Sequence, residues 1–552
     1  MGDFITLRNK IIISILLVST VLGCKNSKQS IKTELKPLVE APFTKLDTLA
    51  INDWWNRKDN PIINLKVERD QVIAFGIYTV ANNRLKLTSQ FFPLYPHESR
   101  DAKLEIKTEG SWKHIATEKI NDIGWSALFK IDNWNYEKDV PYRIRHGENA
   151  FFEGMIRKDP KDKNEIKLAA LSCNSNQDRG DRNEYVRNIN FQDPDLVFFA
   201  GDQSYDHTEH TAAWLKFGMQ FREVFRNRPC ITIPDDHDVG QGNLWGEGGK
   251  KASTQAGDDG GYFYHPEYVK MVERCQTGHL PDPYDPTPID QGIGVYYTGF
   301  ILGGVDFAVI EDRKFKSGPK GKIPQIGPRP DHIRDPNYDP KSVDKEGLYL
   351  LGDRQLKFLE DWGQQHSEML KVVLSQTGFC GGAHLHGSKT NRLHADMDSN
   401  GWPQTGRNNA LKLIKKANAV HIAGDQHLAT VIHHGIEQFE DGPWAFVVPA
   451  IVNNYYSRWW WPEDEKAGGH QIGTLPWTGN YLDGFGNKIT MYAYVNPEAH
   501  SKGAGYGLIR FNKIDKKVTF ECWPREMDVT KDTATQFEGW PITVNPISVR
   551  GN

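Results

Sequence analysis

Side chains that bind metals or phosphate stand directly after short apolar runs in the middle of the chain. They include a thiol, a phenol, carboxylates and imidazoles: Cys173, Asp202, Tyr205, Asp235-Asp236-His237-Asp238, Asp312-Arg313, Ser375-Gln376, Asp425 and His427. Each alone has a simple explanation, because an aspartate after a strand often closes a turn and a lone cysteine often packs as a small apolar residue. Core packing does not, however, require acidic groups at successive strand ends. The set therefore indicates a centre that binds cations and phosphate.

These residues meet if the apolar runs are strands of one α/β domain. The runs are rich in Val, Ile, Leu, Phe and Ala, and cover 166–174, 195–205, 229–238, 305–313, 370–378 and 419–427. Helix-like stretches lie between them, near 181–193, 208–226, 353–367 and 405–417. This alternation predicts a largely parallel sheet, in which ligands bind beyond the carboxyl ends of the strands. Gly- and Pro-rich stretches at 239–262, 279–294 and 316–345 are expected to form loops over that edge.

The chain before residue 165 has a different pattern, in which apolar and polar residues alternate over short stretches such as 64–80 and 84–95. Short strands at regular spacing predict an N-terminal antiparallel β-sandwich. The predicted organisation is a tether at 25–54, a β-sandwich domain at 55–162, a catalytic domain at 166–530 and a C-terminal tail at 531–552.

The first 24 residues predict export. Arg8 and Lys10 precede an apolar run over 11–22 that is short for a membrane span, and Gly23-Cys24 follows it. This arrangement resembles a bacterial lipoprotein signal, after whose cleavage Cys24 is lipidated. An ordinary signal peptide or a membrane anchor is the alternative. We expect an exported protein that its lipid anchor holds in the cell envelope, on the periplasmic or outer-membrane face.

Composition excludes several classes of protein. The 552 residues suggest two or three domains, and the 11% aromatic content excludes disordered, collagen-like and coiled-coil chains. The net charge is −4 and no basic stripe is present, so we expect no nucleic-acid partner. Six cysteines are present, and removal of Cys24 leaves five, so at least one is unpaired.

The motifs together resemble one known family. Ser172-Cys173-Asn174, Gly201-Asp202-x-x-Tyr205, Asp235-Asp236-His237-Asp238, Asp312-Arg313, Leu351-Gly352-x-x-Gln355 with Trp362, and Gly424-Asp425-Gln426-His427 look like the PhoD-type alkaline phosphatase family. That family belongs to the metallophosphoesterase superfamily. The resemblance implies a four-layer α/β/β/α sandwich preceded by an N-terminal β-sandwich, and it implies hydrolysis of phosphate esters, both monoesters and diesters.

The resemblance also implies a site with two metal ions that share Asp202. Cys173, Tyr205 and His427 would hold a ferric ion together with Asp202, since phenolate and thiolate suit a highly charged ion. Asp236 and Asp425 would complete a second, oxygen-rich site for Ca²⁺, with Mn²⁺, Mg²⁺ or Zn²⁺ as alternatives.

Catalytic roles follow from the same resemblance. A metal-bound hydroxide would attack phosphorus in line, and Arg313 would contact phosphate oxygens. His237 would protonate the leaving alkoxide or support the charge of the transition state. Asn243 and Arg458 are weaker candidates for substrate contacts. Trp459-Trp460-Trp461, next to Arg458, is expected either to wall the cleft or to pack between domains.

Two other functions remain open at this point. The chain could be a non-catalytic surface-binding lipoprotein on a phosphatase scaffold, or an exported nuclease or phospholipase that uses the same metals. The sequence leaves the leaving group, the preference for monoester or diester, and the oligomeric state open.

Overall fold

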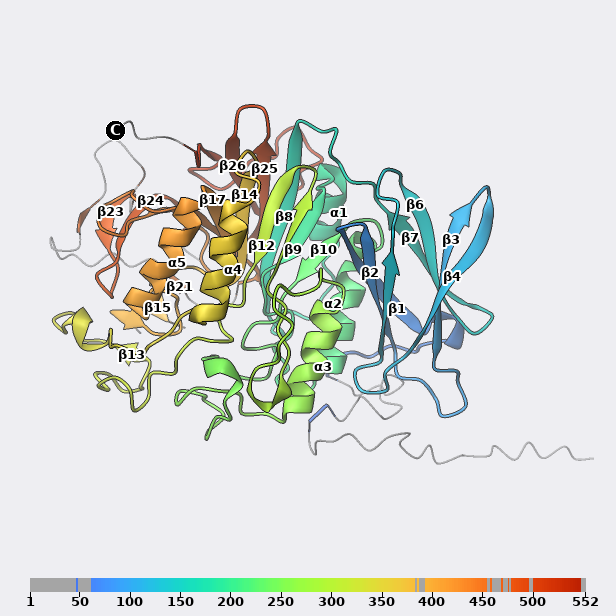
Figure 1. Cartoon of the computed structure of the whole chain (residues 1–552), viewed down its shortest axis with the longest axis horizontal. Coiled ribbons are helices and arrows are strands. Elements are labelled where there is room, and N and C mark those ends of the chain that lie inside the picture. Colours follow the sequence, from blue (N-terminus) through green and yellow to red (C-terminus); the bar gives the residue numbers. More distant parts are fainter. Residues whose placement is uncertain are drawn as a thin grey trace, which may run out of the picture. The chain divides into compact units, whose positions relative to one another are not determined.

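The computed structural model describes residues 46–47, 61–382, 385–386, 393–453, 457–458, 468–469, 475, 478–495 and 500–547 (Figure 1). The predicted signal peptide with Cys24, nearly all of the predicted tether and the Trp459–Trp461 run lie outside these residues. Across the described ranges, no helix has both the length and the apolar character needed to cross a membrane.

The first strands form two antiparallel sheets. The three-stranded sheet has the order β1-β2-β5 and the four-stranded sheet the order β4-β3-β6-β7. Their bounds are β1 (Ile73–Ala81), β2 (Arg84–Phe91), β3 (Asp101–Thr108), β4 (Ser111–Lys119), β5 (Ser126–Asp132), β6 (Val140–His146) and β7 (Ala150–Ile156), after the 3-10 turn η3 (Arg69–Gln71). Residues of β6 are alternately buried and partly exposed, as expected for a strand with one face toward a core. The predicted domain limits 55–162 stay a prediction.

A seven-stranded mixed sheet follows. Its order is β10-β9-β8-β25-β26-β27, with β20 also paired to β8. The bounds are β8 (Glu165–Asn174), β9 (Leu196–Phe199), β10 (Cys230–Thr232), β20 (Ala450–Val452), β25 (Gly505–Asn512), β26 (Lys517–Pro524) and β27 (Ile542–Val544). Strands β8, β9 and β10 are parallel, so their carboxyl ends share one edge of the sheet.

A nine-stranded sheet has the order β11-β12-β14-β17-β19-β18-β24-β23-β22. The bounds are β11 (Thr298–Leu302), β12 (Val305–Val309), β14 (Leu370–Thr377), β17 (Ala419–Gly424), β18 (Thr430–His434), β19 (Trp444–Val447), β22 (Gly468–Gly469), β23 (Gly479–Leu482) and β24 (Lys488–Tyr494). Strands β12, β14, β17 and β19 are parallel. Two short pairs, β13 (His332–Ile333) with β16 (Ala395–Asp396) and β15 (Leu385–His386) with β21 (Ser457–Arg458), lie outside it.

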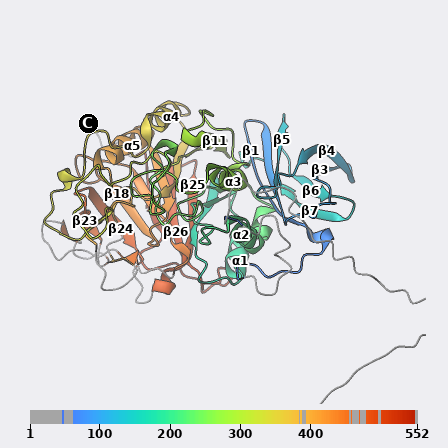
Figure 2. The same ribbon diagram turned by 90° about the horizontal axis from the view of Figure 1, so that it is seen from below.

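Helices complete the layers. They are α1 (Asn183–Gln192), α2 (His210–Phe225), α3 (Pro266–Thr277), α4 (Gly352–Gln364) and α5 (Gln404–Lys416), with the 3-10 turns η4 (Glu247–Gly249), η5 (Asp290–Gly292), η6 (Pro340–Ser342) and η8 (His500–Gly503). Helices α1, α2 and α3 share a hydrophobic cluster with the seven-stranded sheet, and α4 and α5 share one with the nine-stranded sheet. Figure 2 shows the same elements from below.

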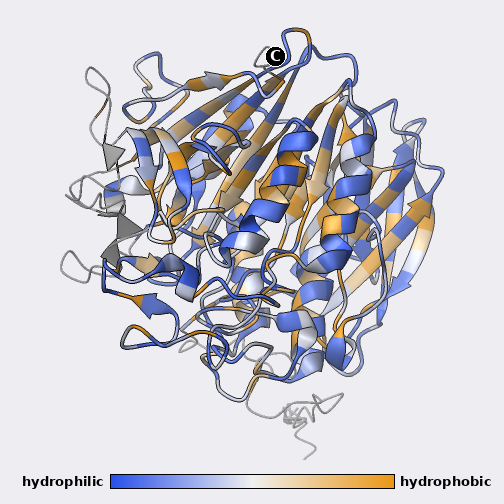
Figure 3. Ribbon diagram, turned by 60° about the vertical axis from the view of Figure 1, so that its left-hand side comes forward, coloured by the Kyte–Doolittle hydropathy of each residue, from blue (hydrophilic) through white to orange (hydrophobic). Residues whose placement is uncertain are grey.

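Alternation of side chains along the strands explains why the sheets are covered on both faces. In β8, Leu168 and Ala170 belong to the cluster between the two sheets, whereas Ala169 and Leu171 belong to the cluster with α1 and α2. In β14, Val372 and Val373 divide in the same way between the inter-sheet cluster and the cluster with α4 and α5. Because neighbouring residues of a strand point to opposite faces, near-continuous apolar runs are buried on both sides. Figure 3 shows this concentration of apolar residues along the strands.

Four features were not anticipated by the sequence predictions. Helix α3 was not predicted, and both large sheets carry antiparallel strands beside their parallel ones. Within the predicted tail at 531–552, β27 pairs with β26 and Trp540 is buried in the inter-sheet cluster, while the limits of the tail stay a prediction. At the other end, Asp47 lies within the predicted tether and is nevertheless buried against Thr211 at the start of α2.

Candidate metal centre and active-site cleft

The proposed metal ligands follow strands of both large sheets. Cys173 lies at the end of β8, Asp202 follows β9, and Asp236 follows β10. Asp425 and His427 follow β17 of the other sheet (Figure 1). The two sheets thus deliver their chemistry-bearing residues to a common edge.

The backbone at this edge is unusual. Cys173, Asp202, Asp425 and His427 have φ values of 57°, 60°, 67° and 51°, in the left-handed region that non-glycine residues rarely adopt. Such conformations cost about 1–3 kcal/mol each and persist only where the surrounding structure holds them. The strain lies at the residues predicted to bind cations, which is where functional sites concentrate it.

Close packing explains why a glycine precedes the aspartate in both Gly-Asp motifs. A Cβ atom on Gly201 would lie 2.6 Å from Cβ of Asp235, and one on Gly424 would lie 2.1 Å from Oγ of Ser172. Only a glycine lets β9 and β17 approach these neighbours closely enough to bring the following aspartates into the site.

The side chains form two groups that share Asp202. Ligand atoms of Cys173, Asp202 and His427 all lie within 4.8 Å of one another, and so do those of Asp202, Asp235, Asp236 and Asp425. The Tyr205 hydroxyl donates to Oδ2 of Asp202 at 2.8 Å and lies 3.1 Å from Nε2 of His427, so it joins the first group. All six predicted ligands are therefore brought together.

The donor set fits cations. Oδ1 of Asp202 and Oδ1 of Asp236 are buried and make no hydrogen bond with the described residues. Burial, and then repulsion from neighbouring carboxylates, raises the pKa of Asp202 and that of Asp236 well above the ordinary range. Burial likewise raises the pKa of the Cys173 thiol and of the Tyr205 phenol. Multivalent cations would remove this penalty, because they favour the ionised form of every one of these groups.

Arg313 lies elsewhere than predicted. Its guanidinium is buried, with Nε 2.7 Å from Oδ1 of Asp235, Nη1 2.6 Å from Oδ1 of Asp398 and Nη2 2.9 Å from Oδ1 of Asp425. Carboxylates thus engage all three nitrogens, which leaves no free fork for a phosphate. We therefore replace the predicted phosphate contact with a supporting role, in which Arg313 fixes carboxylates of the second group.

His237 faces the cleft, as the resemblance implied, and has a partner that the sequence analysis missed. Nε2 of His207 lies 2.6 Å from Nδ1 of His237, and the Tyr205 ring lies 4.2 Å from the His237 ring. Burial lowers the pKa of both imidazoles. The only sequence signal for His207 was its position two residues after Tyr205.

Asp238 is a second residue whose role the sequence did not reveal. Its Oδ2 accepts hydrogen bonds from the backbone N–H groups of Asp202 and Asp235. Its Oδ1 accepts one hydrogen bond from the backbone N–H of Ser204 and another from the side-chain amide of Gln276. Asp238 thereby joins the loops after β9 and β10, and it positions two of the carboxylates.

A cleft of about 470 Å³ opens above these groups. Its lining includes His207, His237, Asn243, Arg329 and Asp396. Asn243, a predicted substrate contact, lines the cleft and donates to Oδ2 of Asp331. Arg458, the other predicted substrate contact, belongs to β21, and its side chain is not among those that the structure describes.

Comparison with known proteins gives two kinds of match. Residues 213–458 match the PhoD-like phosphatase family model, a stretch that contains Asp236, Asp425 and His427 and begins after Asp202. A solved structure of PhoD is similar with a TM-score of 0.58 at 16% identity, over 86% of this chain and 90% of that chain. Purple acid phosphatase PPD1 from yellow lupin (Lupinus luteus) seeds gives a TM-score of 0.52 at 10% identity, over 86% and 74%. No curated protein matches the sequence. The predicted four-layer architecture with N-terminal antiparallel sheets is confirmed.

Proposed function

The chain carries a PhoD-like phosphatase domain, and from this premise we propose that it is an exported, metal-dependent phosphoesterase with a dinuclear site. The observation that carries the proposal is the sharing of Asp202 between two groups of potential ligands, whose atoms lie within 4.8 Å in each group. Burial of several carboxylates together is energetically unfavourable, and the binding of cations for catalysis explains it better than a non-catalytic binding function does.

The two groups favour different ions. Cys173, Tyr205 and His427 with Asp202 would hold a ferric ion, because thiolate and phenolate stabilise a high charge. Asp236 and Asp425 with Asp202 offer only oxygen, which suits Ca²⁺, Mn²⁺ or Mg²⁺. When bound, such ions supply Lewis acidity and an activated water molecule for hydrolysis of a phosphate ester.

The chain's own residues would bind, orient and donate hydrogen bonds. The alcohol leaving group would occupy the cleft beside His237, whose ring is held by the adjacent ring of Tyr205 and by His207. Nε2 of His237 is then the atom available to donate a hydrogen bond to the departing oxygen and to stabilise the charge that develops there. Arg313 and Asp238 would keep the carboxylates in place while charge develops on the phosphate.

Substitution of the shared carboxylate tests the function. We expect Asp202→Ala to lose metal from both groups and to lose activity on the order of 10³-fold or more, since several kcal/mol of transition-state stabilisation depend on the ions. Activity is measured with p-nitrophenyl phosphate and bis-p-nitrophenyl phosphate, with and without Ca²⁺ and a chelator. The matched control is Asp532→Ala, which removes an exposed aspartate. Full activity and full metal content in Asp202→Ala would refute the assignment.

Visible absorption and metal analysis test the identity of the bound metal. Phenolate bound to ferric iron absorbs visible light through charge transfer, so the purified protein should be coloured and contain iron. Tyr205→Phe should shift or remove the band while Asp236→Ala keeps it, because Asp236 belongs only to the second group. A colourless, iron-free protein that hydrolyses the substrates would contradict a ferric site.

We also propose that Cys24 is lipidated and that the protein is anchored in the cell envelope. The support is the basic residues, the short apolar run and Gly23-Cys24 in the sequence. The full-length protein should fractionate with membranes, and Cys24→Ser should release it from them. Equal membrane association of both forms would contradict the lipid anchor.

A further inference from the structure

Among the residues that the structure describes, one arginine or lysine lines the cleft. Five aspartates line it, and Arg329 is the only arginine or lysine among the described residues that do so. Since Arg313 is buried behind carboxylates, Arg329 is the cation that a negatively charged ligand in the cleft would meet.

Arg329 is held in a fixed orientation by a buried carboxylate. Its Nε and Nη2 donate to Oδ1 and Oδ2 of Asp331, at 3.0 and 2.7 Å. Asp331 is 1% exposed and also accepts a hydrogen bond from Asn243, at 2.9 Å. The arginine side chain is half-exposed, and its Nη1 makes no hydrogen bond with the described residues. One edge of the guanidinium is therefore anchored while the other is available to a ligand.

Several contacts separate Arg329 from the proposed cation ligands. Asp331 lies beside His332, with 3.4 Å between Oδ2 and Nε2, and His332 in turn lies 3.9 Å from Asp396. The carboxylate of Asp396 accepts the backbone N–H of Asp398, which is the partner of Arg313. Arg329 itself contacts none of the proposed ligands within the described part of the chain. A phosphate held at those ligands would therefore be separated from Arg329 by these contacts.

We propose that Arg329 binds a second anionic group of the substrate. The substrate class would be phosphate esters whose organic part carries a further phosphate or carboxylate. This inference rests on the proposed phosphoesterase function, since it places the reacting phosphate at the two ligand groups that share Asp202. Arg329 is then a specificity-determining residue, and Asp331 and Asn243 are its positioning residues.

The test compares two ligands that differ by one phosphate. Fructose 6-phosphate and fructose 1,6-bisphosphate are used as competitors of p-nitrophenyl phosphate hydrolysis by the metal-loaded full chain, at constant free metal concentration. We expect the wild type to bind the bisphosphate about tenfold more tightly, as one charge-assisted hydrogen bond at a half-exposed site allows. In Arg329→Gln the ratio of the two inhibition constants should fall to near one.

Control variants separate charge from fold. Arg334→Gln removes an exposed arginine on the other side of the short strand β13 that does not line the cleft, and should keep the wild-type ratio. Arg329→Lys keeps the charge without the fork, and should keep part of the preference. Asp331→Asn weakens the anchor and should reduce the preference without removing it.

The outcomes distinguish this inference from the proposed function. Equal inhibition constants in the wild type would overturn the second-anion site even though p-nitrophenyl phosphate is hydrolysed. A loss of affinity in Arg329→Gln that is equal for both ligands would also overturn it, because the arginine would then contact the reacting phosphate. Absence of p-nitrophenyl phosphate hydrolysis in the metal-loaded wild type would refute the proposed function itself.

Discussion

At the scale of single residues, His207 shows how a neighbour can set the chemistry of a catalytic candidate. Burial lowers the pKa of His207 and of His237, so both rings are neutral near pH 7 and each carries one ring proton. With 2.6 Å between Nε2 of His207 and Nδ1 of His237, one of these two atoms donates to the other. If His207 donates, His237 keeps its own proton on Nε2, where a leaving group would need it.

This arrangement predicts a dependence on the leaving group. His207→Ala should lower kcat for glycerol 2-phosphate about 10- to 100-fold more than for p-nitrophenyl phosphate, since an alkoxide needs protonation and p-nitrophenolate hardly does. His207→Gln retains an N–H donor and should restore part of the loss. Equal losses for both substrates would show that His207 has only a structural role.

The predictability of the site differs from residue to residue. Cys173, Asp202 and Asp425 could be predicted because their position at or just after the end of a strand determines where they lie. Arg313 also follows a strand, but its contacts depend on Asp398, which a long loop brings from elsewhere in the chain. Loop geometry likewise decides the positions of His207 and Arg329, and no periodicity in the sequence encodes it.

At the scale of elements, the start of helix α2 depends on a residue far away in the sequence. Asp47 accepts hydrogen bonds from the backbone N–H and the hydroxyl of Thr211, in the first turn of α2. Helix N-termini expose N–H groups that need acceptors, and Glu209, at the N-cap position, makes no side-chain cap. The segment before the first sheet therefore caps a helix beside the seven-stranded sheet.

Asp47 makes stability depend on pH. Burial raises its pKa from the ordinary 3.8 to about 7 in the folded protein. The folded state holds the proton of Asp47 more tightly than the unfolded state does. The contribution of protonated Asp47 to the free energy of unfolding is therefore full below pH 4 and is lost as the pH rises to about 7. The loss is at most about 4 kcal/mol, from about 1.4 kcal/mol per pKa unit. Asp47→Asn should reduce this pH dependence, which chemical denaturation between pH 4 and 8 measures. An unchanged slope would contradict the raised pKa.

Most elements of the large sheets agree with their sequence patterns. Helix α5 (Gln404–Lys416) lies within one residue of the predicted 405–417, and β8 (Glu165–Asn174) within one of 166–174. Strands β9 and β10 are shorter than predicted, because the residues that follow them turn into the site. Helix α3 escaped prediction because it lies between two Gly- and Pro-rich stretches rather than between two apolar runs.

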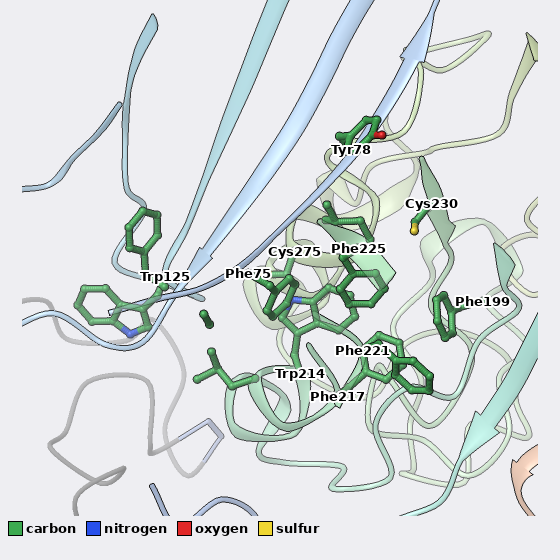
Figure 4. Packing of buried hydrophobic residues seen from close by; sticks show 14 of the residues in the cluster. Phe75, Tyr78, Trp125, Phe199, Trp214, Phe217, Phe221, Phe225, Cys230 and Cys275 are labelled. Carbon is green, nitrogen blue, oxygen red and sulfur yellow. The ribbon is translucent and has the colours of Figure 1, made fainter. Parts of the chain in front are cut away.

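At the scale of the whole molecule, α2 contacts the N-terminal antiparallel strands through an aromatic cluster. The ring of Phe75 in β1 lies 5.5 Å from Trp214 and 5.6 Å from Phe225, both in α2 (Figure 4). Gly218 lies at the point of closest approach, where a Cβ atom would be 1.8 Å from the Phe75 ring. The cluster continues from β1 through α2 to Phe199 of β9.

Gly218→Ala tests this contact. In an exposed helix, replacement of glycine by alanine stabilises the folded state by about 1 kcal/mol. At Gly218 the clash with Phe75 should destabilise the folded state by about 1–3 kcal/mol or more, so the net effect should be destabilising. We expect a lower Tm in thermal unfolding. Gly242→Ala, where a Cβ would meet nothing within 4 Å, is the control. The double variant Gly218→Ala with Phe75→Leu should lose less than the two separate losses combined, and strict additivity would argue against the contact.

The four-layer architecture could be predicted from the order of strands and helices together with the family motifs. The antiparallel strands β25 and β26, which extend the seven-stranded sheet beside β8, could not be predicted in this way. The pairing of β25 with β8 joins residues more than 300 positions apart in the sequence, so only the folded structure reveals it, and β26 then adds to the sheet beside β25.

The proposed ligands come from both sheets, with Asp202 after β9 and Asp425 and His427 after β17. Two metal ions that share Asp202 as a ligand would therefore cross-link the two sheets at this edge. Removing the metal ions would leave four crowded acids between the two sheets, which are also joined by apolar packing and by Arg313. Bound ions would offset the repulsion among these acids, so the metal-loaded protein should resist heat and proteases better than the metal-free protein.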